Sequence, residues 1–240
     1  IRLIMKVTNF KANTRGHADH GWLESYHSFS FANYHNPQRM GFGVLRVLND
    51  DRVTSGMGFG KHPHDNMEII SIPLSGDLEH QDSMGTTAVI KSGDVQVMSA
   101  GTGIYHSEKN KTQGGEVKFL QIWVQPNKRG VEPRYDQITL NPADLDNKLA
   151  QILSPNKDDD GVWVYQDAWF HMGNLNAGTE VTYDVKKEGN GVYAFLLEGD
   201  ATVAAETLNR RDAVGITEAD SFTVKADSDA KILLMEVPMN

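Results

Sequence analysis

The chain has 240 residues, of which 39% are hydrophobic and 23% are charged, a composition that is ordinary for a soluble globular protein. It contains no cysteine, which excludes disulfide bonds and thiolate metal sites, so any metal ion must be bound by nitrogen and oxygen atoms. The absence of cysteine fits a reducing cytoplasm, where we expect the protein. No run of about 18 apolar residues occurs, which excludes a membrane-spanning helix.

The net charge of -9 is unevenly distributed along the chain. Up to Gly130 there are 14 basic and 12 acidic residues, whereas from Val131 onward there are 9 basic and 20 acidic residues. Because binding to phosphate groups requires basic side chains, the acidic second half argues against direct contact with nucleic acid. Histidine shows the opposite bias, since eight of the nine lie at or before His106. Any metal site is therefore expected in the first half.

Four histidines come early in the chain among several aromatic residues. A separate metal site there is conceivable, but we favour a folded arm in which the aromatic side chains pack into the core. The residues concerned are His17, His20, His27 and His35, with Trp22, Phe29, Phe31 and Tyr34.

Short apolar runs follow, and glycine-containing turns such as Ser75-Gly76-Asp77 and Gly101-Thr102-Gly103 interrupt them. Strands at this spacing are typical of a β-sandwich or a β-barrel. The predicted strands are Met67–Leu74, Leu78–Asp82, Ala88–Lys91, Val95–Met98 and Val117–Gln125.

Two segments near the middle of the chain read differently. Gln125–Gln137 is polar and contains two prolines and a glycine, which predicts a linker. In Asn141–Leu153 the leucine spacing predicts one short helix.

The second half repeats the first in outline. Leu74–Asp77 (LSGD) resembles Leu197–Asp200 (LEGD), and a series of strands and turns surrounds each segment. This similarity indicates an internal duplication. We therefore expect two domains, residues 1–130 and residues 131–240.

Two pairs of residues with the same spacing carry the possible chemistry. In His62-Pro63-His64 the histidines are two apart, so on an extended strand both point to one face. His106 and Glu108, further along, are also two apart. Three imidazoles and one carboxylate form a normal ligand set for a divalent transition metal. From the residues alone, surface or core histidines without a metal remain an equal alternative.

The spacing of these residues resembles known motifs. Gly58-x3-His62-x-His64-x3-Glu68-x7-Gly76 resembles the first cupin motif, and Gly103-x2-His106-x3-Asn110 resembles the second. Gly16–Tyr34 resembles the N-terminal signature of the pirin family, and Ser99–Glu108 resembles its second metal segment. The chain is similar in particular to bacterial pirin-like proteins with quercetin 2,3-dioxygenase activity. This resemblance implies an all-β fold of two jelly-roll-like cupin barrels in tandem, with one or two short helices.

The resemblance also implies that His62, His64, His106 and Glu108 bind one divalent transition metal ion. The sequence does not distinguish among iron, zinc, manganese, nickel, cobalt and copper. General cupins use the glutamate that corresponds to Glu68, but the pirin pattern assigns this role to Glu108, and Glu68 is then expected to support the site by hydrogen bonding. His80 lies on a predicted strand, and its role is left open.

The second half lacks the corresponding ligands. Val185 and Lys187 occupy the positions where the repeat would place the two histidines, and no histidine follows Val214. We therefore expect a second barrel without a metal.

The function implied by the resemblance is that of a metal-dependent dioxygenase that opens flavonols such as quercetin, with Glu108 as the catalytic base. Its partners would be a small aromatic substrate and dioxygen. The alternative is a regulatory protein that acts through a protein partner, as eukaryotic pirin does in transcription. A cupin that acts on another small metabolite is the third reading.

Overall fold

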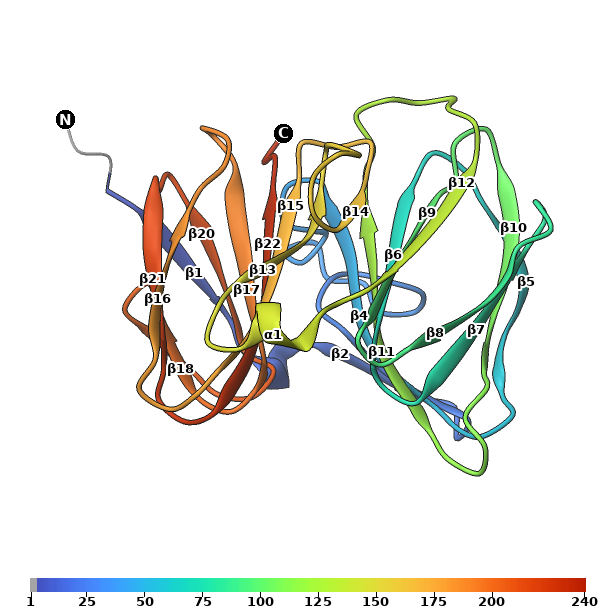
Figure 1. Cartoon of the computed structure of the whole chain (residues 1–240), viewed down its shortest axis with the longest axis horizontal. Helices are drawn as coiled ribbons and strands as arrows, with labels where there is room; N and C mark the ends of the chain where they lie inside the picture. The colour runs from blue at the N-terminus through green and yellow to red at the C-terminus, as the bar shows by residue number, and fades with distance from the viewer. Residues whose placement is uncertain (1–3) are drawn as a thin grey trace.

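The computed structural model describes residues 4–240, which form two β-barrels side by side (Figure 1). Each barrel is built from a seven-stranded sheet and a four-stranded sheet, so the all-β fold of two tandem barrels is confirmed. A four-residue α-helix, α1 (Pro142–Leu145), and a short 3-10 turn (Ala12–Thr14) are the helical segments among these residues.

The first barrel contains the seven-stranded sheet β12-β9-β6-β11-β4-β3-β2 and the four-stranded sheet β5-β10-β7-β8. Its strands are β2 (Gly16–Asp19), β3 (Leu23–His27), β4 (Leu45–Val53), β5 (Gly58–His64), β6 (Glu68–Ser75), β7 (Asp77–Asp82), β8 (Thr87–Lys91), β9 (Asp94–Ser99), β10 (Ile104–Asn110), β11 (Val117–Val124) and β12 (Arg134–Thr139).

The second barrel contains the sheets β1-β20-β17-β22-β15-β13-β14 and β16-β21-β18-β19. Its strands are β1 (Lys6–Phe10), β13 (Ala150–Ser154), β14 (Val162–Trp163), β15 (Trp169–Leu175), β16 (Glu180–Asp184), β17 (Gly191–Glu198), β18 (Ala201–Val203), β19 (Glu206–Leu208), β20 (Ala213–Thr217), β21 (Ser221–Ala226) and β22 (Ala230–Val237).

The five strands predicted from apolar runs all form, as β6, β7, β8, β9 and β11. β6 is nearly continuous in apolar residues because it is covered on both faces. Ile70 and Ile72 belong to the core between the barrels, and Ile69 belongs to a cluster inside the first barrel. A strand with one face exposed to solvent would have shown alternating apolar and polar residues.

Two predictions from the sequence are wrong in part. The linker expected over Gln125–Gln137 ends earlier, because β12 begins at Arg134 and pairs with β9. The helix expected over Asn141–Leu153 stops at Leu145, and Leu153 lies in the strand β13. The backbone of Asn147 has a positive φ of 55°, which is incompatible with a continued right-handed helix.

The two halves of the chain also exchange strands. β1 comes from the first half but pairs with β20 of the second barrel, and β12 follows residue 131 but pairs with β9 of the first barrel. The division into residues 1–130 and 131–240 stays a prediction as a domain boundary, and the sheets themselves interlock across it.

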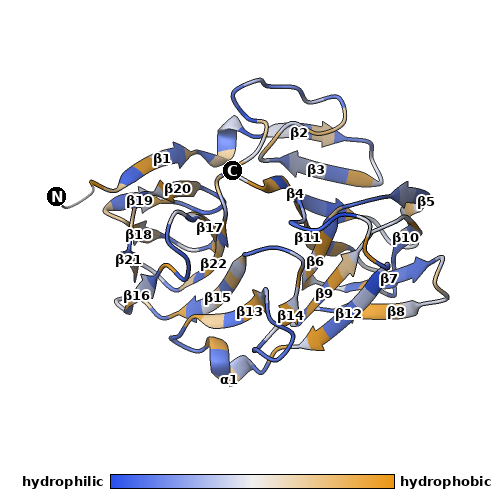
Figure 2. Ribbon diagram, turned by 90° about the horizontal axis from the view of Figure 1, so that it is seen from above, coloured by the Kyte–Doolittle hydropathy of each residue, from blue (hydrophilic) through white to orange (hydrophobic). Residues whose placement is uncertain are grey.

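The main apolar core lies between the barrels, where the two seven-stranded sheets face each other (Figure 2). Both sheets contribute to it, through side chains such as Leu48 and Leu120 from the first barrel and Phe170, Phe195 and Leu233 from the second. Fully burying one such side chain contributes about 1.5–3 kcal/mol, so this interface holds the barrels as one unit.

The interiors of the two barrels differ. The second barrel is filled by an apolar cluster that includes Val192, Leu196 and Leu234. The first barrel has small apolar clusters, represented by Phe119 and Met98, and many buried polar residues besides. The interior of the first barrel is therefore the better candidate for a metal or substrate site.

His171, on β15, is the one histidine of the second half, and its burial is expected to make the stability of the protein depend on pH. It is 6% exposed and packs edge-on against Tyr183, and burial lowers its pKa to about 4. The unfolded chain takes up this proton near pH 6.5, so stability is lost as the pH falls from 6.5 toward 4. We expect the wild type to lose about 2–3 kcal/mol more than a His171→Asn variant between pH 7 and pH 4.5, measured by urea unfolding. Equal losses in the two proteins would contradict this.

No helix within residues 4–240 has the length and apolar character required to cross a membrane.

Candidate metal centre

Three of the predicted ligands meet on the paired strands β5 and β10. His106 lies directly opposite His62, and Ile104 lies opposite His64, so the three histidines share the inner face of the four-stranded sheet. The ring centroids of His62 and His106 are 4.4 Å apart, and the ring of His64 lies 4.8 Å from each of them. Each ring offers one nitrogen to a group in which all three nitrogens lie within 4.8 Å of one another.

A β-bulge in β5 helps to orient His62. Between His62 and Phe59 the register with β10 shifts, so that Gly60 and Lys61 together face Ser107. The Nδ1 atom of His62 lies 2.7 Å from the carbonyl oxygen of Gly60. Because a carbonyl oxygen only accepts, Nδ1 carries the proton and donates it, which leaves Nε2 free as a ligand atom.

Glycine at position 58 allows the two strands to approach. A Cβ atom there would lie 2.3 Å from the carbonyl oxygen of Glu108 and 2.5 Å from the Cα of Lys109, both backbone atoms that cannot move aside. The close pairing of β5 with β10, and therefore the meeting of the histidines, requires Gly58.

The protonation of these histidines suits metal binding. Burial, reinforced by the neighbouring histidines, lowers the pKa of His64 to about 4 and that of His106 to about 2, so both rings are neutral at physiological pH. Their Nε2 atoms lie 3.0 Å apart. Two ligand nitrogens at about 2.1 Å from one ion, in directions at right angles, are also about 3.0 Å apart. The three histidines therefore fit a divalent transition metal.

Glu108 is fully buried on β10 and held by two donors. Ser71 donates through Oγ at 3.1 Å and Gln121 through Nε2 at 2.6 Å. Burial raises the pKa of Glu108 to about 7, and a cation nearby would favour the ionised form. Its carboxylate forms a close donor group with His106 and His80 rather than with the three clustered histidines, so its place in the ligand set stays a prediction.

Glu68, the ligand position of general cupins, is held here by hydrogen bonds. It is buried at the start of β6 and accepts hydrogen bonds from Ser99 Oγ at 3.0 Å and from the backbone N–H of Tyr165 at 2.6 Å. Among the described residues it belongs to no close group of metal donors. It instead ties the first barrel to the loop that precedes β15.

His80 is the nearby residue whose role the sequence left open. On β7 it lies opposite Glu108, and its side chain is fully buried. Its Nε2 atom is 2.7 Å from an oxygen of Asp82. The alternation of Leu78, His80 and Asp82 along a predicted strand was the signal that all three face the interior.

A row of polar side chains crosses the inner face of the seven-stranded sheet beside the centre. The register aligns these residues strand by strand, from β9 through β6, β11 and β4 to β3, and two of them are the hydrogen-bond donors to Glu108. They are Gln96, Ser71, Gln121, Asn49 and His27.

Several buried polar atoms in this barrel have no hydrogen-bond partner within the protein. They belong to Gln96, Asn49, His27, His80, His106 and Trp123. Buried polar atoms are normally paired, so this interior is suited to hold water, a metal ion or a polar ligand.

A cavity of about 320 Å³ lies at the β3–β4 end of the polar row, with Ser25, His27, Asn49, Asp51 and Gln121 in its polar wall. Burial raises the pKa of Asp51, which accepts a hydrogen bond from Ser25, to about 7.

Two links join this cavity to the metal centre. Gln121 lines the cavity and also donates to Glu108. Phe31 lines it as well and packs edge-on against Trp123 at 5.6 Å, and Trp123 packs against His64 at 5.0 Å.

Three of the four early histidines lie around this cavity, and none of the four belongs to a close metal-donor group among the described residues. His17, His20 and His27 line it, and His17 is hydrogen-bonded to Glu24 at 3.0 Å. Within residues 4–240 no close group of three metal donors includes them or His35.

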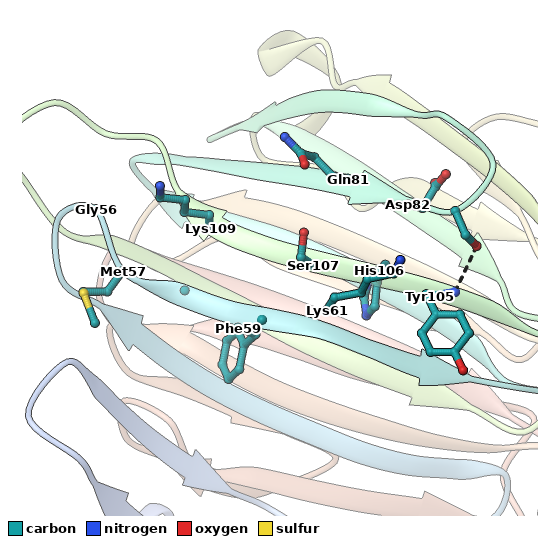
Figure 3. Close-up of a pocket in the computed structure, with 13 residues that line it drawn as sticks. Gly56, Met57, Phe59, Lys61, Gln81, Asp82, Tyr105, His106, Ser107 and Lys109 are labelled. Atoms are coloured by element: carbon teal, nitrogen blue, oxygen red, sulfur yellow. Dashed lines mark hydrogen bonds between the residues drawn. The ribbon is translucent and has the colours of Figure 1, made fainter.

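A larger hollow of about 620 Å³ lies over β5, β10 and β7 (Figure 3). Lys61, Tyr105, Ser107 and Lys109 line it, and these residues alternate along the strands with the histidines and Glu108. Neighbouring residues on a strand point to opposite faces, so these four residues line the hollow from the outer face of the sheet, while His106 and Asp82 line it from the inner face.

Comparison with known proteins agrees with this architecture. The family model for pirin matches residues 9–124, and the model for the quercetinase C-terminal cupin domain matches residues 151–237. The quercetin 2,3-dioxygenase of Escherichia coli strain K12 is 40% identical over 228 residues, which cover 95% of this chain and 97% of that protein. A pirin-like protein of Caulobacter vibrioides is 38% identical, covering 92% of this chain and 95% of that one.

A solved structure shows the same fold. The crystal structure of the bacterial pirin YhhW from Escherichia coli, in complex with nickel(II), superposes with a TM-score of 0.92 at 38% identity and covers 97% of this chain and 99% of that one. The two barrels, their order and the identity over nearly the whole length show that this chain belongs to the pirin family of cupin proteins.

Proposed function

We propose that the protein is a metal-dependent dioxygenase that opens flavonols such as quercetin, with His62, His64, His106 and Glu108 as the metal ligands. The observation that carries the proposal is the convergence of three histidines next to a buried carboxylate and a cavity. Its relatives named quercetin 2,3-dioxygenase and the nickel(II) complex of the Escherichia coli pirin support both the activity and the metal. We also propose that residues 1–130 form the metal-binding domain and that residues 131–240 support it by packing.

The metal would supply a Lewis-acid centre that polarises the flavonol hydroxyl and favours the reaction of the ring with dioxygen. In this reaction both atoms of dioxygen enter the ring-opened product, and one carbon of the flavonol leaves as carbon monoxide. The protein must therefore position an aromatic molecule, accept one proton and keep the site shielded from bulk water.

The cavity beside Gln121 provides a place for the aromatic substrate. Phe31 and Phe59 line it and offer ring faces or edges, while Asn49 and Asp51 offer polar atoms to the hydroxyl groups of a flavonol. A cavity of this kind, mostly apolar with a few convergent polar groups, is typical of small-molecule sites.

Glu108 is the proposed proton acceptor. Its carboxylate lies on the inner face, two residues from His106, and a cation bound beside it would keep it ionised and able to accept a proton. Ser71 and Gln121 hold one oxygen each, which fixes the direction in which the carboxylate faces.

The test is an assay of the purified protein with quercetin, with and without oxygen, after its metal content has been measured. We expect oxygen-dependent loss of the flavonol absorbance with release of carbon monoxide, and loss of both in a His62→Ala variant. Full metal occupancy without turnover on a panel of flavonols would contradict the proposal. That result would favour a regulatory role or another small substrate.

A further inference from the structure

A buried pair, Asp82 and His80, lies on β7 opposite His106 and Glu108 of β10. Both side chains are fully buried, and the Nε2 atom of His80 is 2.7 Å from Oδ2 of Asp82. The other carboxylate oxygen, Oδ1, accepts the backbone N–H groups of Met84 and Thr86 at 2.9 and 3.1 Å. Every oxygen of Asp82 therefore accepts, and its orientation is fixed by the turn between β7 and β8.

This environment sets the tautomer of His80. A carboxylate accepts hydrogen bonds, so Nε2 of His80 carries the proton and donates it to Asp82. The other ring nitrogen, Nδ1, then presents a lone pair. It is buried and has no partner within the protein.

His106, in turn, requires a hydrogen-bond acceptor. If its Nε2 is a metal ligand, its proton is on Nδ1, and ligating histidines normally donate that proton to an acceptor. Nδ1 of His106 is also buried and unpartnered. The rings of His80 and His106 have their centroids 5.5 Å apart, and a nitrogen of each ring lies within 4.8 Å of the other. Two neighbouring rings thus offer an unpaired acceptor on His80 and, once Nε2 of His106 binds a metal, an unpaired donor on His106.

We propose that Asp82 and His80 are positioning residues for His106: the N–H of His106 Nδ1 donates to His80 Nδ1, directly or through one water molecule, and His80 Nε2 donates to Asp82. This relay holds the ring of His106 with Nε2 toward the ion. It also makes that nitrogen a stronger electron-pair donor to the metal. Tyr135, from β12, packs against His80 with centroids 4.5 Å apart and restricts the tilt of its ring. The inference rests on the proposed ligand set, since it needs His106 to bind metal through Nε2.

The isosteric variant Asp82→Asn provides the sharpest test. The N–H groups of Met84 and Thr86 keep the amide oxygen on their side, so the amide NH₂ faces His80. Nε2 of His80 must then accept, its proton moves to Nδ1, and two N–H groups face each other across the gap to His106. We expect the affinity for nickel(II), measured by chelator competition, to fall about 10- to 100-fold.

A second pair of variants keeps the test decisive if Asp82→Asn folds poorly. His80→Asn places an amide oxygen near the position of Nδ1 and should retain most of the affinity, whereas His80→Phe keeps a ring but has no acceptor and should lose it. Asp136→Asn, the same chemical change at an exposed carboxylate on β12, should bind nickel(II) like the wild type. Nitrogen-15 NMR of the metal-free protein should show His80 protonated at Nε2.

The outcomes separate this inference from the proposed function. If His62→Ala loses nickel(II) while Asp82→Asn and His80→Phe bind it as tightly as the wild type, the relay is wrong and the ligand set stands. If His62→Ala binds nickel(II) as tightly as the wild type, the ligand set itself fails. An NMR signal for His80 protonated at Nδ1 would also overturn the relay, whatever the metal affinities.

Discussion

Replacing His106 by alanine is expected to lower the affinity for nickel(II) by more than about a hundredfold, which exceeds the usual cost of losing an outer-shell partner of a ligand. The reason lies in its position, because His106 belongs to both close donor groups, one with His62 and His64 and one with His80 and Glu108. No other residue of the described chain is shared by the two groups. Chelator competition, followed by metal analysis of the dialysed protein, measures the loss.

His171→Ala is the matched control, since it removes a buried histidine from the second barrel. His171 is 6% exposed, close to the 1% of His106, so both changes delete a buried imidazole. The control is expected to reduce stability but to leave nickel(II) affinity within about twofold of the wild type. Equal metal retention by the two variants would contradict the ligand set.

The sequence predicts which of these residues share one face of a strand, because side chains alternate with a period of two, but it does not predict which strands pair. Residues two apart share a face, so His62 with His64, and His106 with Glu108, could each be placed on one side of a strand. What brings the two pairs together is the register between β5 and β10, which has a bulge at Gly60 and Lys61. A bulge changes the parity of a strand by one residue and has no reliable sequence signal beyond the glycine.

The errors in the middle of the chain have a common physical cause. Arg134–Thr139 is polar and follows a proline, so it reads as a linker, yet it pairs along its whole length with β9 at the edge of the sheet. An edge strand half open to solvent needs no apolar alternation. Likewise the leucines of Asn141–Leu153 match a helical period, but packing between the barrels recruits Leu153 into a strand. Tertiary contacts outweighed the local pattern in both cases.

The support of the metal centre was the least predictable part. Ser71, Gln121 and Asn49 lie on three strands separated in sequence by up to 72 positions, and only the register of the sheet aligns them. No local pattern links such residues. Cross-strand alignment is a property of the folded sheet and could not have been read from one sequence.

The Glu108→Gln variant is expected to lose about 10²- to 10⁴-fold in the rate of flavonol opening if Glu108 accepts the substrate proton. The fold should survive, because the hydroxyl of Ser71 can rotate to accept from the amide NH₂ while the amide oxygen still accepts from Gln121. The variant therefore removes the base and keeps the shape of the site. The rate constant kcat, normalised to bound metal, is the quantity to compare.

Normalisation to bound metal matters because Glu108 is assigned two roles. As a ligand, its replacement lowers metal occupancy, but a preparation with saturating nickel(II) would then regain its rate. As a base, its replacement lowers the rate of every metal-loaded molecule, and saturating metal restores nothing. Glu116→Gln, at a glutamate with a 44% exposed side chain, controls for the chemical change and should keep the wild-type rate. A metal-saturated Glu108→Gln protein with the wild-type kcat would show that Glu108 is a ligand only. The substrate proton would then have to pass to another group. Asp51 in the adjoining cavity is the most similar carboxyl, because burial also raises its pKa to about 7.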